Sequence, residues 1–209
     1  MSASSLRAAF PALAQAAGQI GGWQIQNRAT LGGNLANASP AGDSLPVLLA
    51  LDATVVLASV RGLREIPYDG FHAGYRKTAL QPGEIVARIR LPLPPAGTVQ
   101  AFRKVGTREA QAISKVVVAM AGRIEDGRIA EIRLAAGSVA PTPIRLRAAE
   151  DAVRGQAPGS DAAHIADIAD IAGREAAGAV TPIDDVRSTA EYRRFALERV
   201  VRRMVLELT

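Results

Sequence analysis

Residues 27–43 read Asn-Arg-Ala-Thr-Leu-Gly-Gly-Asn-Leu-Ala-Asn-Ala-Ser-Pro-Ala-Gly-Asp and are the most informative part of the chain. Two adjacent glycines, Gly32 and Gly33, stand between Thr30 and Asn34. Because glycine has no Cβ, paired glycines let the backbone approach a bulky anion closely and adopt positive φ at little cost. Successive amides in such a turn form a concavity that suits phosphate oxygens. The pattern therefore predicts a nucleotide-type binding loop.

The polar side chains around the glycines favour the same interpretation. Thr30 and Asn34 can add hydrogen bonds, and Asp43, which ends the stretch, can accept from sugar or ribityl hydroxyls. The alternative is a Gly/Asn/Ser/Pro turn without a ligand, because such turns are common. For Asp43 the alternative is that it caps the helix that follows. Composition alone leaves these alternatives open.

Four motifs occur in order along the chain, and the glycine stretch belongs to the first. They lie at residues 24–34 (continued by Ala38-Ser39-Pro40 and Asp43), 74–78 (Gly-Tyr-Arg-Lys-Thr), 82–85 (Pro-Gly-Glu-Ile) and 184–194. Together they resemble the motifs of the FAD-binding medium subunits of molybdenum hydroxylases. That family includes the medium subunits of xanthine dehydrogenase and carbon monoxide dehydrogenase. Because the motifs are ordered and spread over nearly the whole chain, the resemblance is specific.

The resemblance implies an α+β fold in two domains. Residues 1–94 would form the second lobe of a PCMH-type FAD-binding domain. Residues 97–209 would form a domain like the C-terminal domain of carbon monoxide dehydrogenase flavoprotein, with a three-stranded antiparallel sheet plus helices. Members of the family carry a first FAD-binding lobe upstream of the glycine stretch, and this sequence lacks that lobe. Three explanations are open: the gene is split and a separate chain supplies the lobe, the start of the sequence is misassigned, or the chain is a remnant.

The resemblance also implies a function. The chain would be an FAD-dependent oxidoreductase subunit that passes electrons from iron–sulfur clusters on a partner subunit through FAD to an external acceptor. The [2Fe-2S] clusters and molybdopterin would be held by an iron–sulfur subunit and a molybdopterin subunit. One alternative is a truncated assembly module that docks these partners without FAD. The other is a flavoprotein of the cell-wall-precursor reductase type, which the motif at residues 184–194 and the predicted sheet before it disfavour.

The resemblance assigns cofactor-site roles to individual residues. The glycine stretch would contact the flavin cofactor, an acid would hydrogen-bond it, and an apolar residue would pack against the flavin. Two neighbouring cations stand where the family places one, and either could be the one near the flavin or lie on a solvent-facing strand edge. Tyr75, Arg76 and Lys77 either shape this site or form a structural turn. The assigned residues are Thr30, Gly32, Gly33, Asn34, Asn37, Ser39, Asp43, Val86, Arg103 and Lys104.

The amino-acid composition limits which catalytic and metal-binding groups the chain can provide. The chain has 209 residues, a formal net charge of +5 and no cysteine, so it offers no thiolate nucleophile and no iron–sulfur ligand. Its two histidines, His72 and His164, stand far apart and suggest neither a metal site nor a catalytic residue. Flavin chemistry needs neither, because the cofactor performs the redox step.

The distribution of charged and apolar residues along the chain indicates which partners and which cellular location to expect. Arginines are dense only near the C-terminus and aromatic residues are scarce, which disfavours nucleic-acid binding. The basic C-terminal helix would either dock an acidic partner or be merely solvated. No apolar run approaches the ~18 residues of a membrane span, and no signal-peptide pattern is present, so a cytoplasmic location is expected.

Periodicity predicts the elements before and after a proline-rich linker at residues 92–97. Residues 84–91 should alternate, with Ile85, Ala87 and Ile89 on one face. Asp126-Gly127 should form a tight turn between two strands. In the last helix an apolar stripe that includes Tyr192 and Phe195 should pack on the sheet. The predicted helices are 11–20, 43–51, 145–154, 162–177 and 189–208, and the predicted strands are 53–60, 64–67, 84–91, 99–105, 114–124 and 128–138.

Overall fold

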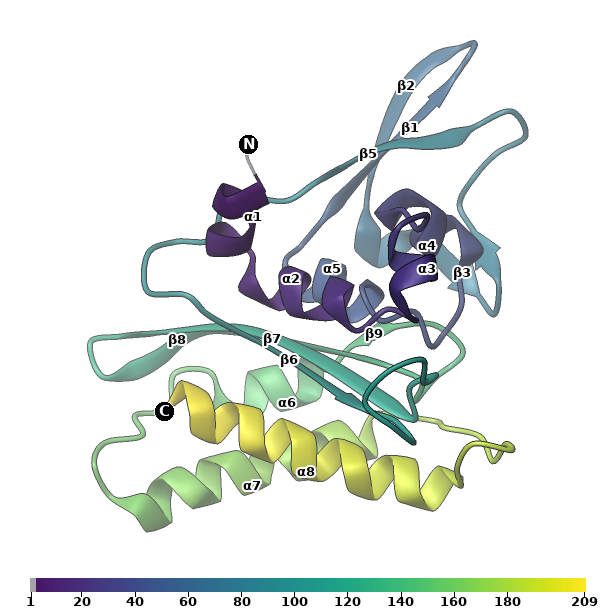
Figure 1. Ribbon diagram of the computed structural model, residues 1–209. Coiled ribbons are helices and arrows are strands. Elements are labelled where there is room, and N and C mark those ends of the chain that lie inside the picture. The colour runs from purple at the N-terminus through teal and green to yellow at the C-terminus, as the bar shows by residue number, and fades with distance from the viewer. Residues whose placement is uncertain (1–2) are drawn as a thin grey trace.

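The computed structural model describes residues 3–209. A four-stranded antiparallel sheet crosses the middle of the molecule, with three helices below it and the N-terminal helices and a smaller sheet above it (Figure 1). The α+β class predicted from the sequence is confirmed.

The N-terminal part contains short helices and a three-stranded sheet. Pro46 lies in the first turn of its helix, where the missing N–H costs nothing. Three of the helices, α1, α3 and α4, were not predicted. The elements are α1 (Ala3–Ala9), α2 (Pro11–Gly18), α3 (Trp23–Gln26), α4 (Leu31–Asn37), α5 (Leu45–Ala50), β1 (Thr54–Ser59), β2 (Gly62–Pro67), η1 (Tyr68–Gly70), β3 (His72–Gly74), β4 (Lys77–Thr78) and β5 (Ile85–Arg90).

The alternation predicted for β5 is wrong. Val56 pairs with Arg88 and Leu57 with Val86, so a bulge at Ala87 shifts the register by one residue. Val86 and Ile89 consequently pack against the core, whereas Ile85 and Ala87 are exposed. A strict period of two cannot anticipate a bulge, because one extra residue moves the rest of the strand to the other face.

The C-terminal part holds the larger sheet, in the order β6-β7-β8-β9. The three predicted strands are present, and a two-residue fourth strand joins β8. Asp126 and Gly127 both have positive φ, as the predicted tight turn requires. The elements are β6 (Val99–Val105), β7 (Val116–Glu125), β8 (Arg128–Gly137), β9 (Ile144–Arg145), α6 (Arg147–Val153), α7 (Ala162–Gly178) and α8 (Ala190–Leu208).

Helix α8 begins where the sequence predicted, because the Thr189 side chain accepts from the Tyr192 amide and caps it. The predicted stripe is partly wrong. Tyr192 and Phe195 are 42% and 54% exposed, whereas Leu197, Val201 and Val205 are buried against the sheet. Lys115 and Arg199 lie over the exposed rings at 5.1 and 5.3 Å, so aromatic–cation pairs form on the solvent side.

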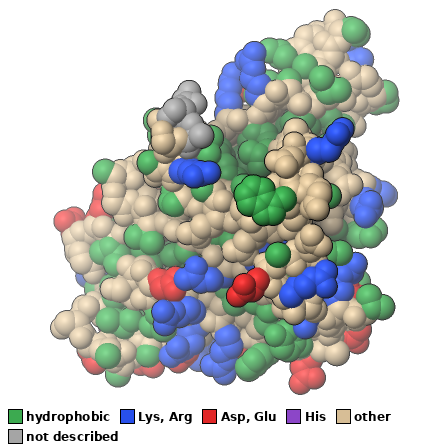
Figure 2. Space-filling model, in the orientation of Figure 1, with side chains coloured by type: hydrophobic (Ala, Val, Ile, Leu, Met, Phe, Trp, Pro, Cys, Tyr) green, Lys and Arg blue, Asp and Glu red, His purple; other side chains and the backbone are tan. Residues whose placement is uncertain are grey.

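The arginines of α8 do not form an isolated basic face. Arg203 pairs with Glu207, which also accepts from Arg103, and Arg202 pairs with Asp170 of α7. Figure 2 shows basic side chains beside acidic ones on this side of the molecule. The mixed signs favour a solvated helix surface.

Both faces of the larger sheet are covered. One face packs on α6, α7 and α8 through residues of the C-terminal part alone. The other face supplies Phe102, Val117 and Ala119 to a core that also contains residues of α2, α5 and β1. The two parts of the chain therefore share a hydrophobic core across residues 92–97. The division into domains at 1–94 and 97–209 stays a prediction.

Within residues 3–209, no helix combines the length and apolar character that crossing a membrane requires. The same residues contain no cluster of three or more His, Asp or Glu side chains suited to a metal ion.

Candidate functional site

The glycine stretch forms a helix rather than the predicted turn. Gly32 and Gly33 lie in the first turn of α4 and neither has positive φ. Thr30 is the N-cap residue, and its Oγ1 accepts from the Gly33 amide at 2.9 Å. The predicted loop is therefore corrected to a capped helix start, and the Gly33 amide is already engaged. The tripeptide Leu-Gly-Gly has poor helix propensity, which is why local sequence favoured a turn.

Gly32 lies where α4 packs next to β5. A Cβ on Gly32 would stand 3.5 Å from Cγ1 of Val86, an ordinary van der Waals contact. Val86, one of the predicted site residues, is half-buried and packs against the core. The structure thus places Val86 behind the start of α4.

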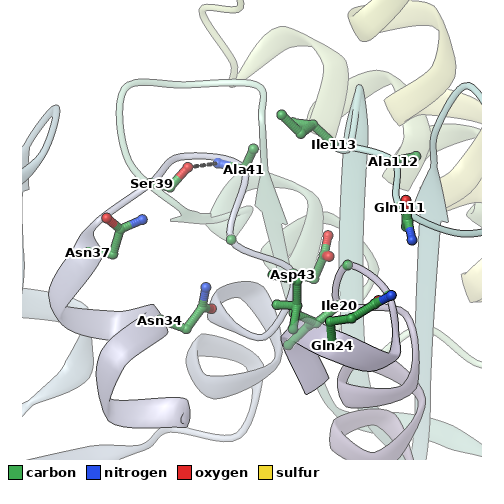
Figure 3. Close-up of a pocket in the computed structure, with 14 residues that line it drawn as sticks. Ile20, Gln24, Asn34, Asn37, Ser39, Ala41, Asp43, Gln111, Ala112 and Ile113 are labelled. Carbon is green, nitrogen blue, oxygen red and sulfur yellow. Dashed lines mark hydrogen bonds between the residues drawn. The ribbon is translucent and has the colours of Figure 1, made fainter. Parts of the chain in front are cut away.

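A cleft of about 600 Å³ opens beside α4 and gathers four of the predicted residues. Asn34 and Asn37 come from α4, and Ser39 and Asp43 come from the segment that connects α4 to α5. Figure 3 shows these side chains around one hollow. Asn34 Oδ1 accepts from Ser44 Oγ at 2.7 Å, so the side-chain NH₂ of Asn34 remains as a donor.

Asp43 is the most unusual residue of the cleft. It is 7% exposed, and its Oδ2 accepts from Lys104 Nζ at 2.6 Å. Its Oδ1 is buried and has no hydrogen-bond partner among the described residues. Burial raises the pKa of Asp43, and the neighbouring ammonium of Lys104 opposes this shift without cancelling it. A buried carboxylate oxygen without a donor is costly, so Oδ1 is suited to accept from a ligand hydroxyl.

The alternative role of Asp43 as a helix cap is wrong. Ser44 occupies the N-cap position of α5 and makes no side-chain capping bond. The bond of Asp43 runs instead to Lys104 on β6.

The two candidate cations, Arg103 and Lys104, lie on opposite faces of β6. The Lys104 ammonium lies behind Asp43 and also donates to the Gln19 carbonyl at 3.0 Å. The Arg103 guanidinium binds both carboxylate oxygens of Glu207 at 2.7 and 2.9 Å. Adjacent strand residues point to opposite faces, which separates the pair. Lys104 is therefore the cation at the cleft, and it reaches the cleft through Asp43.

A larger groove of about 1100 Å³ continues from the cleft along α1 to α4. Asn34 and Asn37 line both cavities. The groove contains the predicted residues Thr30 and Gly33, and its walls are mostly apolar. Arg7 and Arg28 also line it, and Arg28, two residues before the Thr30 cap, is a cation suited to an anionic ligand near the N-terminus of α4.

Sequence reasoning missed one wall of the cleft. Gly21, Gly22 and Gln111 line it together with Ile20, Ala112 and Ile113. The backbone N–H of Gln111 donates to the Gly21 carbonyl at 3.2 Å. This bond joins the β6–β7 connection to the segment after α2. These contacts link residues about ninety positions apart, and no local motif marks them.

The motif at residues 74–78 forms the turn between β3 and β4. Arg76 has a φ of 52° and lies over the Tyr75 ring at 5.9 Å. Tyr75 and Arg76 line a separate cavity of about 590 Å³, which shares Ser39 with the cleft. The exposed Lys77 lines neither cavity.

Comparison with known proteins identifies the family. Residues 1–94 match the family described as the FAD binding domain in molybdopterin dehydrogenase, and residues 100–208 match the CO dehydrogenase flavoprotein C-terminal domain. The chain belongs to the FAD-binding medium subunits of the xanthine dehydrogenase and carbon monoxide dehydrogenase family. The family predicted from the four motifs is confirmed.

Individual relatives agree with this assignment. The chain is 42% identical to the xanthine dehydrogenase FAD-binding subunit of Escherichia coli O157:H7 over 142 residues, which are 68% of this chain and 49% of that protein. It is 32% identical to the carbon monoxide dehydrogenase medium chain of Hydrogenophaga pseudoflava over 204 residues, 97% of this chain and 68% of that one. The chain thus spans about half to two thirds of the length of these relatives.

Solved structures share the fold. Carbon monoxide dehydrogenase from Hydrogenophaga pseudoflava superposes with a TM-score of 0.87 at 32% identity, over 95% of this chain and 67% of that chain. The reconstituted carbon monoxide dehydrogenase from Oligotropha carboxidovorans gives a TM-score of 0.89 at 26% identity, over 99% of this chain and 71% of that chain.

The residues of the cleft and groove fit part of an FAD site. The unpartnered Oδ1 of Asp43 is an acceptor for a hydroxyl, and Asn34 offers a donor. Arg28 and the backbone amides of Leu31 and Gly32, which have no acceptor within the helix, suit phosphate oxygens. The fit comes from one side, because this surface is an open groove rather than an enclosed cavity.

Proposed function

We propose that this chain forms one side of the FAD site of a molybdenum hydroxylase and serves electron transfer through that cofactor. The observation that carries the proposal is the buried carboxylate of Asp43, a residue that lines the cleft: one oxygen binds Lys104 and the other has no donor among residues 3–209. Family membership supplies the identity of the cofactor.

Each predicted residue except Arg103 has a role in the proposal. Oδ1 of Asp43 accepts from a hydroxyl of FAD, while Lys104 holds the carboxylate in place. Asn34, Asn37 and Ser39 line the path between this acid and the start of α4. Thr30 caps α4, and the absence of side chains at Gly32 and Gly33 leaves the helix start open to the phosphates. Val86, on the neighbouring strand β5, lies next to Gly32. Arg103 has no contact with the cofactor.

FAD supplies the redox chemistry when bound, and the protein supplies binding and orientation. This chain contains no cysteine, so the iron–sulfur clusters that deliver electrons must be ligated elsewhere. We therefore propose an iron–sulfur subunit and a molybdopterin subunit as partners. The relatives support this assembly, because one of them is the medium chain of carbon monoxide dehydrogenase.

A further FAD-binding lobe completes the site in this proposal. The cleft and groove are open to one side, and the relatives are longer than the region they share with this chain. One side alone offers few polar contacts to offset the ordering cost of binding a large cofactor. We propose that the lobe closes over the groove between α1 and α4.

A titration of FAD tests the proposal. FAD is added to the chain alone and to the chain co-expressed with the third of the Hydrogenophaga pseudoflava medium chain that lies outside the match. The chain alone should purify colourless, and the pair should bind about one FAD with quenched flavin fluorescence. A pair that binds no FAD would overturn the proposal and favour an assembly module. A monomeric chain that holds FAD tightly by itself would overturn the need for a second lobe.

A further inference from the structure

His72 connects the β3–β4 hairpin to the helix that carries the candidate cofactor residues. It is the first residue of β3, and its Nε2 lies 2.9 Å from the carbonyl oxygen of Leu35 in α4. Figure 1 shows β3 beside α4. The two residues are 37 positions apart in the sequence, and no motif predicted this contact.

The contact determines which nitrogen of the ring carries a hydrogen. A carbonyl oxygen can only accept, so Nε2 must carry the hydrogen. In the neutral ring Nδ1 then has a free lone pair, and it lies 3.4 Å from the hydroxyl oxygen of Tyr68. Burial lowers the pKa of His72 and raises the pKa of Tyr68, so a neutral imidazole faces a phenol that keeps its proton.

Aromatic packing holds the ring in this orientation. The ring centroids of Tyr68 and Phe71 lie 5.4 and 5.2 Å from that of His72, both in edge-on geometry. Tyr68 and Phe71 are fully buried members of the core. The imidazole is therefore anchored to the core on one side and to α4 on the other.

Helix α4 needs such an anchor. It has seven residues, starts with a Leu-Gly-Gly turn and ends at Ala38 in the left-handed conformation. A helix of this length has little stability of its own, so tertiary contacts must fix it. The Leu35 carbonyl also accepts from the Ala38 amide at 3.2 Å, so His72 bonds to the closing turn of the helix. Asn34 and Asn37, which line the cleft, precede and follow Leu35 in the sequence of α4.

A separate binding site at His72 is less well supported. The ring lines a small cleft of about 240 Å³ with Asp69, Arg145 and Arg147. Arg147 pairs with Asp69, and Arg145 pairs with Glu150 and Asp52, so the charges are already partnered. The imidazole nitrogens are also both engaged, by Leu35 and Tyr68. The charged side chains and the imidazole that line this cleft are therefore already partnered.

We propose that His72 is a positioning residue that fixes the C-terminal turn of α4 and thereby aims Asn34 and Asn37 into the cofactor cleft. The cofactor part of this inference rests on the proposed function. The anchoring part concerns the chain itself, so the two can be tested separately.

The first measurement uses the chain without cofactor. Long-range ¹⁵N spectra should show His72 protonated at Nε2 and bare at Nδ1, with His164, the only other histidine, as internal reference. In His72→Leu, hydrogen exchange of the amides at residues 35–39 should accelerate about tenfold, the effect of one lost hydrogen bond, while β7 and β8 stay unchanged. His72→Gln can place an amide N–H at the same carbonyl and should restore protection to within about threefold.

The second measurement is FAD affinity with the completing lobe present. The dissociation constant should rise about tenfold in His72→Leu and stay within about threefold of the wild type in His72→Gln and in the control His164→Gln. Unchanged exchange at residues 35–39 in His72→Leu, or no rescue by His72→Gln, would overturn the anchoring role. Altered exchange with unaltered affinity would overturn the positioning of Asn34 and Asn37. A wild-type pair that binds no FAD would overturn the proposed function, and the anchor is then judged on exchange alone.

Discussion

Lys104 Nζ lies 2.6 Å from Asp43 Oδ2, and this ion pair joins strand β6 to the wall of the cleft. Both side chains are almost completely buried. Burial of two charges is expensive, and Asp43 Oδ1 has no hydrogen-bond partner in the part of the chain that the structure describes. Such an arrangement is more costly than an apolar contact of the same size, which is consistent with a functional requirement for a carboxylate at this point.

We expect Lys104→Met to lower the free energy of unfolding at neutral pH by about 3–5 kcal/mol, because it leaves a buried carboxylate unpaired. The pKa of Asp43 is raised in the folded state, so the native protein binds a proton more readily than the unfolded chain. Lowering the pH through that pKa therefore stabilises the native state, and more so without Lys104. The difference between variant and wild type should shrink as the pH falls, which urea unfolding at several pH values measures.

Arg103→Met is the matched control for Lys104→Met. It removes a cation from the neighbouring position on the opposite face of β6, where the Arg103–Glu207 pair is largely exposed. The expected loss is about 0–1 kcal/mol at neutral pH. Equal losses in the two variants would contradict the distinction between the two cations.

The sequence predicted elements well where the periodicity was long and regular. The last helix, with the Thr189 cap, and the Asp126-Gly127 hairpin depend on contacts between near neighbours. The bulge in β5 and the exposure of Tyr192 and Phe195 depend on partners distant in the sequence, and the periodicity was misleading there.

The candidate site was predicted only where its residues are close together in the sequence. Asn34, Asn37, Ser39 and Asp43 are close in sequence and meet in one cleft. The loop predicted around Gly32 was wrong, because packing next to Val86 and the Thr30 cap outweigh the poor helix propensity of two glycines. The wall formed by Gln111 and the anchor at His72 come from segments far from the glycine stretch, so only the fold reveals them.

Gly32→Ala tests whether the glycine at this position is required for stability or for FAD binding. The atoms nearest to the added Cβ belong to Val86, the first at 3.5 Å, and alanine in a helix is about 0.5–1 kcal/mol more favourable than glycine. The variant should therefore match or exceed the thermal stability of the wild type. If the helix start faces the phosphates, FAD affinity should fall in the same variant. Stability and affinity rising together would contradict this placement of the cofactor.

Gly33→Val should behave differently from Gly32→Ala. A Cβ at this position would stand 3.0 Å from Thr30 Oγ1, so the Thr30 side chain must shift, which strains the capping bond. Loss of an N-cap costs about 0.5–2 kcal/mol. Thermal melts should show lower stability, and FAD titration with the completing lobe should show weaker binding. A normal flavin content would argue against a cofactor at this helix start.

Asp43→Asn tests the acceptor role of Oδ1 with little change in shape. The amide oxygen can still accept from Lys104, but the NH₂ group cannot accept from a hydroxyl. FAD binding should weaken by about 1.5–3 kcal/mol, the range for hydrogen bonds to a charged group. The affinity is measured by flavin fluorescence with the completing lobe present, and the Ser39→Ala variant shows how much a less buried cleft residue contributes. Equal affinity of Asp43→Asn and the wild type would exclude a bond from Oδ1 to the cofactor.

Asp185 should control stability in acid. Burial alone would raise its pKa, but the amides of Arg187 and Ser188 and the guanidinium of Arg193 outweigh burial and lower the pKa to about 2. A folded-state pKa below the unfolded value gives stability that is fully present above the unfolded pKa and is lost as the pH falls towards 2. The carboxylate is partly exposed, so we expect a contribution of about 1 kcal/mol after solvent screening.

Urea unfolding between neutral pH and pH 2 tests this contribution. Asp185→Asn should be less stable than the wild type near neutral pH, and the two curves should converge as the pH approaches 2, because the wild-type carboxylate is then protonated as well. Asp151→Asn, which removes an exposed carboxylate paired with Arg154, is the control and should change stability by at most about 1 kcal/mol over the whole range. Because Asp185 holds Arg193, whose guanidinium also donates to the Lys115 and Ser138 carbonyls, its loss should loosen the start of α8 first. Parallel curves for Asp185→Asn and the wild type down to pH 2 would show that Asp185 has an ordinary pKa in the folded protein.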